Sequence, residues 1–92
     1  MARVRVELPS MLAALLGGAR TIAAEGTTLG EALGDAFAKH PSLRVHIVDE
    51  SGALRRHVLC FHNEVNSRWS EGMDRPLGEG DRITFVQAVS GG

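Results

Sequence analysis

The residues with the clearest chemical potential close the sequence, where Ser90-Gly91-Gly92 follow an apolar, β-branched run from Ile83 to Val89. Glycine has no Cβ, so a backbone that ends in two glycines is thin and conformationally free. Such a tail can enter a narrow active site that side chains would block, and three extended residues span about 10 Å. We predict that the Gly92 carboxylate is the reacting group, and that Ser90 and Gly91 thread it into a partner.

A terminal carboxylate is a poor electrophile until it is activated, for instance as an acyl-adenylate, after which the acyl group can pass to sulfur. That activation needs a nucleotide site. Gly78 and Gly80 resemble a phosphate loop only superficially, because no lysine follows them and no helix begins there. We therefore expect a separate partner to hold the nucleotide. The plain alternative is a loose chain end in which the glycines are incidental.

His57, Cys60 and His62 could suggest a metal site. On an extended strand, however, His57 points to the side opposite His62, and tetrahedral zinc needs four ligands or three and a water. Cys60 in mid-strand is expected to be a small buried side chain and not an activated nucleophile. We predict no metal site and no catalytic residue.

The remaining acidic side chains stand in segments rich in glycine, serine and proline. Turn formation accounts for them better than acid–base catalysis. Without a nucleophile–base pair or a cofactor motif, the chain is expected to be a protein cosubstrate and not an enzyme. The carboxylates in question are Asp49, Glu50, Asp74, Glu79 and Asp81.

Size and composition predict one globular domain over residues 1–92, with residues 89–92 as an exposed tail. The formal net charge of −1 argues against nucleic acid as the main partner. A single cysteine excludes an intramolecular disulfide. No apolar run is long enough to cross a membrane, no signal peptide fits, and the cytoplasm is the expected location.

Strict alternation predicts a half-buried strand over residues 2–8, followed by a short helical turn over residues 9–16 that Gly17-Gly18 closes. A weaker second strand over residues 19–24 is expected to pair antiparallel with the first. Thr28 and Glu31 match a capping box for a helix from Leu29 to Lys39, which Pro41 ends. Gly30 and Gly34 could allow this helix to pack closely on a sheet.

In the second half, Leu43–Val48 is predicted to be extended, as a short strand or a covering loop. The run Val58–His62 is a strand that is apolar on both faces, so one face is either buried or left for a partner. Asn63–Asn66 forms a turn, and a last strand begins after the turn at residues 78–81. Trp69 is either a core or edge anchor or a contact residue, and core packing is favoured. The fold class is α+β, with the helix covering one face of the sheet.

This order of elements and its Gly-Gly end resemble the β-grasp, or ubiquitin-like, fold, with a mixed sheet of four to five strands on one main helix and a flexible tail. More closely, the whole chain resembles the ThiS/MoaD family of sulfur carrier proteins. The segments that carry this resemblance are Val4–Val6, Gly17-Gly18, residues 28–41, residues 49–56, Phe61–Asn63, residues 76–81 and, most specifically, residues 88–92.

The resemblance implies that a ThiF/MoeB-type enzyme adenylates the Gly92 carboxylate with ATP and magnesium, and that a sulfur donor converts it to a thiocarboxylate. A biosynthetic enzyme would then take the sulfur for cysteine, molybdopterin, thiamine or a specialised metabolite. Because the family docks its partners through the exposed sheet face near the tail, Phe61 and Val86 are the candidate docking residues. The carrier itself would bind no cofactor.

Two departures from the family stand at the end of the Val58–His62 strand. Family members often have Asn-Gly where this chain has Asn63-Glu64, and an apolar residue where it has His62. Two other functions stay open. The chain could be a protein modifier conjugated to lysines through Gly92, or a β-grasp interaction module whose glycines are incidental.

Overall fold

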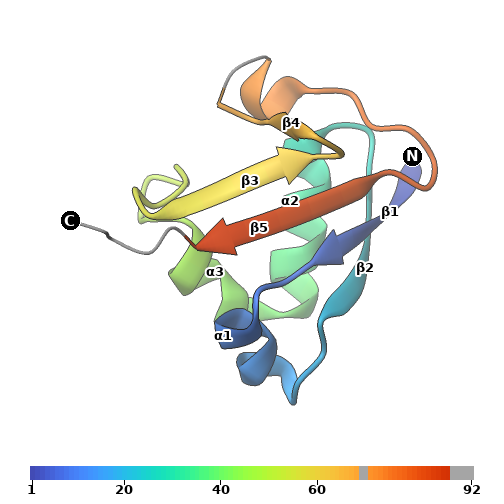
Figure 1. Ribbon diagram of the computed structural model, residues 1–92. Coiled ribbons are helices and arrows are strands. Elements are labelled where there is room, and N and C mark those ends of the chain that lie inside the picture. The colour runs from blue at the N-terminus through green and yellow to red at the C-terminus, as the bar shows by residue number, and fades with distance from the viewer. Residues whose placement is uncertain (69–70, 88–92) are drawn as a thin grey trace.

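The computed structural model describes residues 1–68 and 71–87 (Figure 1). Its elements follow the chain as strands β1 to β5, helices α1 to α3 and two short 3-10 turns. In order they are β1 (Ala2–Glu7), α1 (Ser10–Ala13), η1 (Ala14–Leu16), β2 (Thr21–Gly26), α2 (Leu29–Lys39), α3 (Pro41–Ile47), β3 (Val58–His62), β4 (Val65–Asn66), η2 (Gly72–Asp74) and β5 (Arg82–Gln87).

The five strands form one mixed sheet in the order β2-β1-β5-β3-β4. The first and last strands of the chain lie side by side and parallel, with Val6 in register with Ile83. β5 also pairs antiparallel with β3, and β1 pairs antiparallel with β2. This is the β-grasp arrangement predicted from the sequence, and α2 packs across one face of the sheet (Figure 1).

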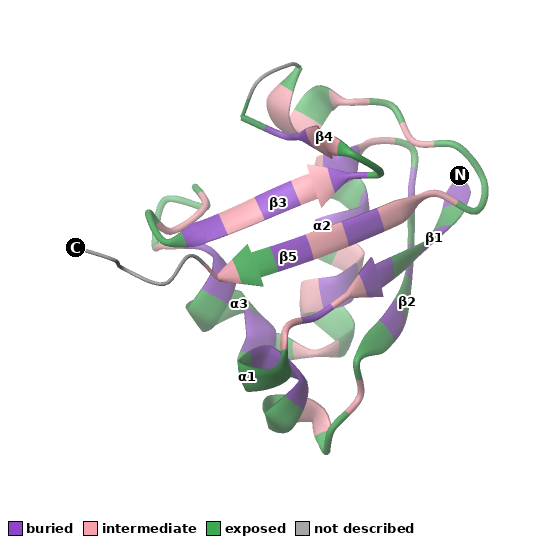
Figure 2. Ribbon diagram, in the orientation of Figure 1, coloured by how far each residue is buried: buried purple, intermediate pink, exposed green. Residues whose placement is uncertain are grey.

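Alternation along the strands separates a core face from an outer face (Figure 2). On β5, Ile83 and Phe85 are buried in the core, while Val86 points outward and is 40% exposed. The core face of the sheet meets the apolar stripe of α2, whose buried members are Leu29, Ala32, Leu33 and Ala36. Burial of this stripe stabilises the helix more than its intrinsic propensity does.

The predicted capping box at the start of α2 is present. The Thr28 hydroxyl accepts a hydrogen bond from the Glu31 backbone N–H at 3.3 Å, and the Glu31 carboxylate accepts one from the Thr27 N–H at 2.8 Å. Immediately before this cap, Gly26 at the end of β2 lies against the helix backbone. A Cβ at Gly26 would come within 2.5 Å of the Ala32 nitrogen, so only glycine fits this approach.

The prediction of an extended Leu43–Val48 segment is wrong, because Pro41–Ile47 forms α3. Pro41 does end α2, as predicted, but it also begins the next helix. Its fixed φ suits the first helical turn, and its missing N–H is not needed there. Leu43 and Ile47, one turn apart, are both fully buried and hold this short helix on the core.

Three smaller differences concern element limits and packing. β2 begins and ends two residues later than expected, so Gly26 belongs to the strand. The turn after β3 is confined to Asn63-Glu64, with Asn63 at φ 54°, and Val65–Asn66 forms the edge strand β4. Gly30 packs against Met73 of η2 and not against the sheet, and a Cβ at Gly34 would meet no atom within 4 Å.

Candidate functional site

The predicted reacting group and its threading residues, Gly92, Gly91 and Ser90, lie outside the residues that the structure describes. The structure describes the chain only as far as the strand that precedes them. The last described residue, Gln87, ends β5 in register with Val58, the first residue of β3. β5 is the middle strand of the sheet, but its last three residues pair with β3 alone, so the described chain ends beside β3.

The two predicted docking residues lie together on the outer face of the sheet. Val86 stands directly opposite Leu59 across the β3–β5 pair, and Phe61 stands opposite Thr84, so Phe61 and Val86 are diagonal neighbours. Leu59 and Phe61 are half-buried, and Val86 is exposed. Leu59, Phe61 and Val86 therefore form one apolar patch, here called the outer patch, close to the end of β5.

Charged side chains border the outer patch on β1 and β5. Arg5 is exposed and in register with Arg82 on the neighbouring parallel strand. Arg82 Nε lies 3.7 Å from a Glu7 carboxylate oxygen, which also accepts a hydrogen bond from the Thr84 hydroxyl at 3.2 Å. Within the described residues no ion pair involves Arg5. The outer face thus combines an apolar centre with a charged margin that holds both arginine and glutamate.

Cys60 lies on the core side of β3 and is fully buried. Burial raises the pKa of its thiol to about 12, and a side-chain hydrogen bond with Ser67 lowers it by less. Because the thiolate is the reactive form of cysteine, this side chain cannot act as a nucleophile near neutral pH. The prediction of a small buried side chain is confirmed.

His62 is also buried, and it joins three segments of the chain. Arg75 Nε donates a hydrogen bond to His62 Nδ1 at 2.7 Å. The proton of the neutral ring is then on Nε2, which donates to Asp81 Oδ2 at 2.6 Å. The same Asp81 oxygen accepts a hydrogen bond from the Gly78 N–H at 2.7 Å. The hydrogen bonds from Gly78 and His62 hold the pKa of the Asp81 carboxyl below its usual value.

These contacts explain why a polar residue can be buried at this strand position. His62 tethers the segment after η2 and the turn before β5 to the end of β3, at the end of the sheet away from Gln87. Asp81 is accordingly a turn and network residue. Asp49 also acts within a turn, where its Oδ1 accepts hydrogen bonds from the Ser51 hydroxyl and the Ser51 and Ala53 N–H groups.

Across residues 1–68 and 71–87, no group of three or more histidine, cysteine or acidic side chains could hold a metal ion. His57 is exposed while Cys60 and His62 are buried, so the three do not converge. In the same part of the chain, no helix has the length and apolar character needed to cross a bilayer.

The sequence predictions missed three residues of this face, Leu59, Arg5 and Arg82. Alternation along Val58–His62 puts Leu59 on the same strand face as Phe61, but only the β3–β5 register shows that it is the direct neighbour of Val86. The adjacency of Arg5 and Arg82 likewise depends on the parallel register of β1 and β5. The alternation of residues along a strand indicates which face each residue occupies, but no local pattern determines which strands are neighbours.

Comparison with known proteins links this architecture to a group of small carriers. Residues 6–92 match the ThiS family. The sulfur carrier protein CysO of Mycobacterium tuberculosis (strain ATCC 25618 / H37Rv) is 33% identical over 91 residues, which cover 97% of this chain and 98% of that protein. The crystal structure of Mycobacterium tuberculosis CysO superposes with a TM-score of 0.84 at 32% identity, covering 94% of this chain and 99% of that one.

Two further solved structures extend this comparison. The crystal structure of the Amycolatopsis orientalis BexX/CysO complex matches with a TM-score of 0.85 at 30% identity, covering 97% of this chain and 99% of that one. The solution structure of small archaeal modifier protein 1 from Methanosarcina acetivorans matches with a TM-score of 0.87 at 26% identity, covering 100% of this chain and 98% of that one.

Proposed function

Because the chain belongs to the ThiS family, we propose that it is a sulfur carrier protein whose C-terminal Gly92 carboxylate bears the sulfur. The observation that carries this proposal is the extent of the family match, which runs from Val6 in the first strand through Gly92. The chain is thus a protein cosubstrate and not an enzyme. Its fold presents a reacting group that other proteins modify.

The chemistry takes place in two steps on a partner. A ThiF/MoeB-type enzyme uses ATP and magnesium to join the Gly92 carboxylate to AMP, releasing pyrophosphate. A sulfur nucleophile then attacks the acyl carbon and displaces AMP, which leaves the thiocarboxylate. On a sulfur-accepting biosynthetic enzyme the thiocarboxylate sulfur bonds to the acceptor substrate, and water then cleaves the bond between the acyl carbon and sulfur, which leaves the sulfur on the product and returns the Gly92 carboxylate. Ser90 and Gly91 thread the tail through both active sites, because they add little bulk to the backbone.

The outer patch is the proposed docking surface for these partners. Leu59, Phe61 and Val86 leave apolar area exposed next to the end of β5, and an apolar centre with a polar margin is the usual anatomy of a protein interface. The Amycolatopsis CysO was solved in complex with a second protein, BexX, which supports assembly as the working state of such carriers.

Intact-mass spectrometry tests the proposal directly. The protein is incubated with a ThiF/MoeB-type enzyme, Mg-ATP and a sulfide donor, and a mass increase equal to the replacement of one oxygen by sulfur is expected. The increase should disappear without ATP and in a chain that lacks Gly92. Absence of the shift with several such enzymes would contradict the proposed function.

A second candidate is a protein modifier, favoured by the structural likeness to small archaeal modifier protein 1. In that case the activated Gly92 would form an isopeptide bond with a lysine of another protein. Immunoblots of cells that express an epitope-tagged chain would show higher-mass conjugates, and these would be absent when Gly92 is deleted. Conjugates without a thiocarboxylate product would favour the modifier over the carrier.

A further inference from the structure

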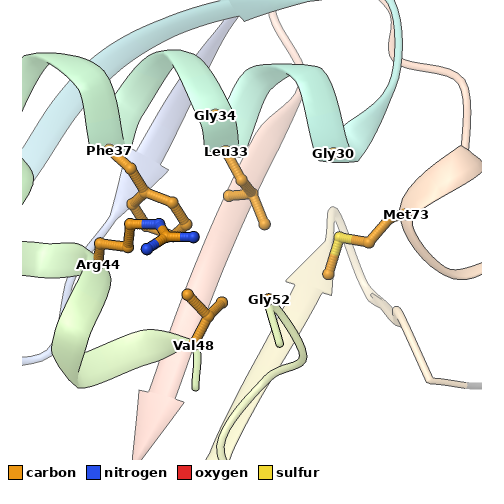
Figure 3. Close-up of a pocket in the computed structure, with 8 residues that line it drawn as sticks. All are labelled: Gly30, Leu33, Gly34, Phe37, Arg44, Val48, Gly52 and Met73. Atoms are coloured by element: carbon orange, nitrogen blue, oxygen red, sulfur yellow. The ribbon is translucent and has the colours of Figure 1, made fainter. Parts of the chain in front are cut away.

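A cavity of about 220 Å³ opens on the helix-covered side of the sheet, where it shares no residue with the outer patch (Figure 3). It lies between α2, α3, the segment after α3 and η2, and is here called the helix groove. The side chains of Leu33, Phe37, Val48 and Met73 converge on it from these different elements (Figure 3). Its walls are therefore mainly apolar.

Gly34 forms part of the lining of the helix groove, and nothing inside the molecule requires a glycine there. It is exposed in the middle of α2, and a Cβ added to it would meet no atom within 4 Å. A glycine in a helix interior costs about 1 kcal/mol relative to alanine. Gly30, one turn earlier, differs because Met73 Cβ would lie 3.2 Å from its Cβ. The absence of a side chain at Gly34 keeps the groove open down to the helix backbone.

Arg44 supplies the charge of the helix groove. It is the one charged residue among the eight described residues that line the cavity. Within the described part of the chain, no ion pair involves Arg44, although Arg44 also lines a smaller, separate cavity together with Asp49 and Glu50. A cation beside an apolar cavity is complementary to a ligand that carries an apolar group next to a carboxylate.

We propose that the helix groove binds a segment of a partner protein that inserts one large apolar side chain and sets a neighbouring carboxylate against Arg44. The size supports this occupant, since about 150 Å³ suffices for a benzene ring, whereas small-molecule and cofactor sites usually begin at about 300 Å³. The groove and the outer patch lie on opposite sides of the sheet. One protein can therefore hold the carrier while another works on Gly92.

An NMR titration tests this proposal without any charging reaction, so its outcome is independent of the proposed sulfur chemistry. The uniformly ¹⁵N-labelled full chain is titrated with the peptide Ac-Ala-Phe-Glu-Ala-NH₂. Saturable shifts are expected for the backbone amides of Gly30, Gly34 and Gly52, which line the groove. Replacing Phe by Ala in the peptide should abolish them, and replacing Glu by Gln should weaken binding about two- to fivefold, as for a half-exposed ion pair.

Matched variants separate groove binding from non-specific contact. Gly34→Leu fills the cavity from the helix and should abolish binding while the spectrum stays folded, because leucine is a better helix former than glycine. Arg44→Glu should weaken binding of the Phe-Glu peptide at least as much as replacing Glu by Gln in the peptide does. Arg20→Glu is the charge-matched control, since Arg20 is exposed and does not line the groove.

Three results would overturn the proposal. The first is no saturable shift at the groove glycines, and the second is binding that Gly34→Leu leaves intact. The third is a shift of the same amides with protein concentration alone, which would make the occupant a second copy of this chain. Shifts at the outer patch without shifts at the groove glycines would be an instance of the first result.

Discussion

Replacing His62 by leucine should destabilise the fold at neutral pH, although leucine suits a buried strand position. The substitution removes the acceptor for Arg75 Nε at 2.7 Å and the donor to Asp81 Oδ2 at 2.6 Å. The two partners, Arg75 and Asp81, are charged side chains, and both remain in place after the substitution. They keep limited access to water, with side-chain exposures of 23% for Asp81 and 17% for Arg75.

The expected magnitude follows from these contacts. A hydrogen bond to a charged group contributes about 1.5–3 kcal/mol, and partial water access places both bonds at the lower end of that range. Burial of the leucine side chain returns about 1 kcal/mol. We expect a net loss of about 2 kcal/mol in the free energy of unfolding, which lowers the Tm of a domain this size by about 8–16 °C.

The dependence on pH provides a sharper check. The pKa of Asp81 is lowered in the folded state by the Gly78 N–H and by His62. A depressed carboxyl pKa stabilises the fold above the unfolded value, near about 3.9, and this stabilisation is lost as the pH falls through the folded value. The difference between the wild type and His62→Leu should therefore be largest near pH 7 and shrink in acid.

Urea unfolding of the wild type, His62→Leu, Asp81→Asn and the double variant measures these quantities at pH 7 and pH 3. We expect a coupling of about 1–2 kcal/mol between the two sites at pH 7, as is usual for residues in one hydrogen-bond network. Thr21→Ala, at an exposed position of β2, serves as a neutral control. A loss below about 0.5 kcal/mol, or no coupling, would refute the interpretation that His62 holds this end of the sheet.

Four other outcomes follow from the same structure. Gly26→Ala should cost about 1–3 kcal/mol or more in urea unfolding, because its Cβ would overlap the Ala32 nitrogen. Thr28→Ala should cost about 1 kcal/mol through loss of the helix cap, without changing the fold seen by circular dichroism. Cys60, whose pKa burial raises to about 12, should resist iodoacetamide at pH 8 until urea unfolds the chain. Val86→Asp should change the unfolding free energy by less than about 1 kcal/mol, as expected for an exposed side chain. It should nevertheless weaken binding to the activating enzyme about tenfold or more by calorimetry, and unchanged affinity would remove Val86 from the docking surface.

Most of the sheet and the main helix could be predicted because local patterns determine them. Alternation from Val4 to Leu8 and from Ile83 to Val86 identifies which residues enter the core, and the structure confirms the inward set over the described residues. The limits of α2 are confirmed because both ends have strong chemical signals. Thr28 caps the start, and Pro41 prevents continuation at the end.

The wrong secondary-structure predictions fall where one residue has two structural roles, or where an element is too short to show a hydrophobic period. Pro41 ends one helix and begins another. The seven residues of α3 hold only two fully buried positions, Leu43 and Ile47, and the same two apolar residues are also compatible with an extended segment. β4 has only two residues, Val65 and Asn66, so it shows no alternation. Its existence depends on pairing with β3, which is tertiary information.

The sequence predicted which residues of Val58–His62 face outward, and the structure confirms that Phe61 shares the outer face with Val86. The roles of the Gly-Gly end and of this face in docking stay predictions. The helix groove had a sequence signal in Gly34, an unfavourable residue inside an otherwise strong helix. The sequence could not show why a glycine stands there, because close packing on the sheet and an open cavity both favour glycine. The position of α3 in the structure was needed to decide between the two.

The pairing of β5 changes along its length, and this bears on the proposed role of the chain end. Arg82 to Thr84 pair with β1, and Ile83 and Thr84 also pair with β3 on the other side, so the start of β5 is held from both directions. Beyond Thr84 the register with β1 ends, and Phe85 to Gln87 pair with β3 alone. The burial of Phe85 anchors this last stretch, while Val86 beside it faces outward. The end of β5 is therefore positioned by β3, the strand that also carries Leu59 and Phe61. Under the proposed function, a partner bound at the outer patch contacts the same strand that positions Gln87, so the proposed docking surface and the proposed delivery of the Gly92 carboxylate depend on one pair of strands.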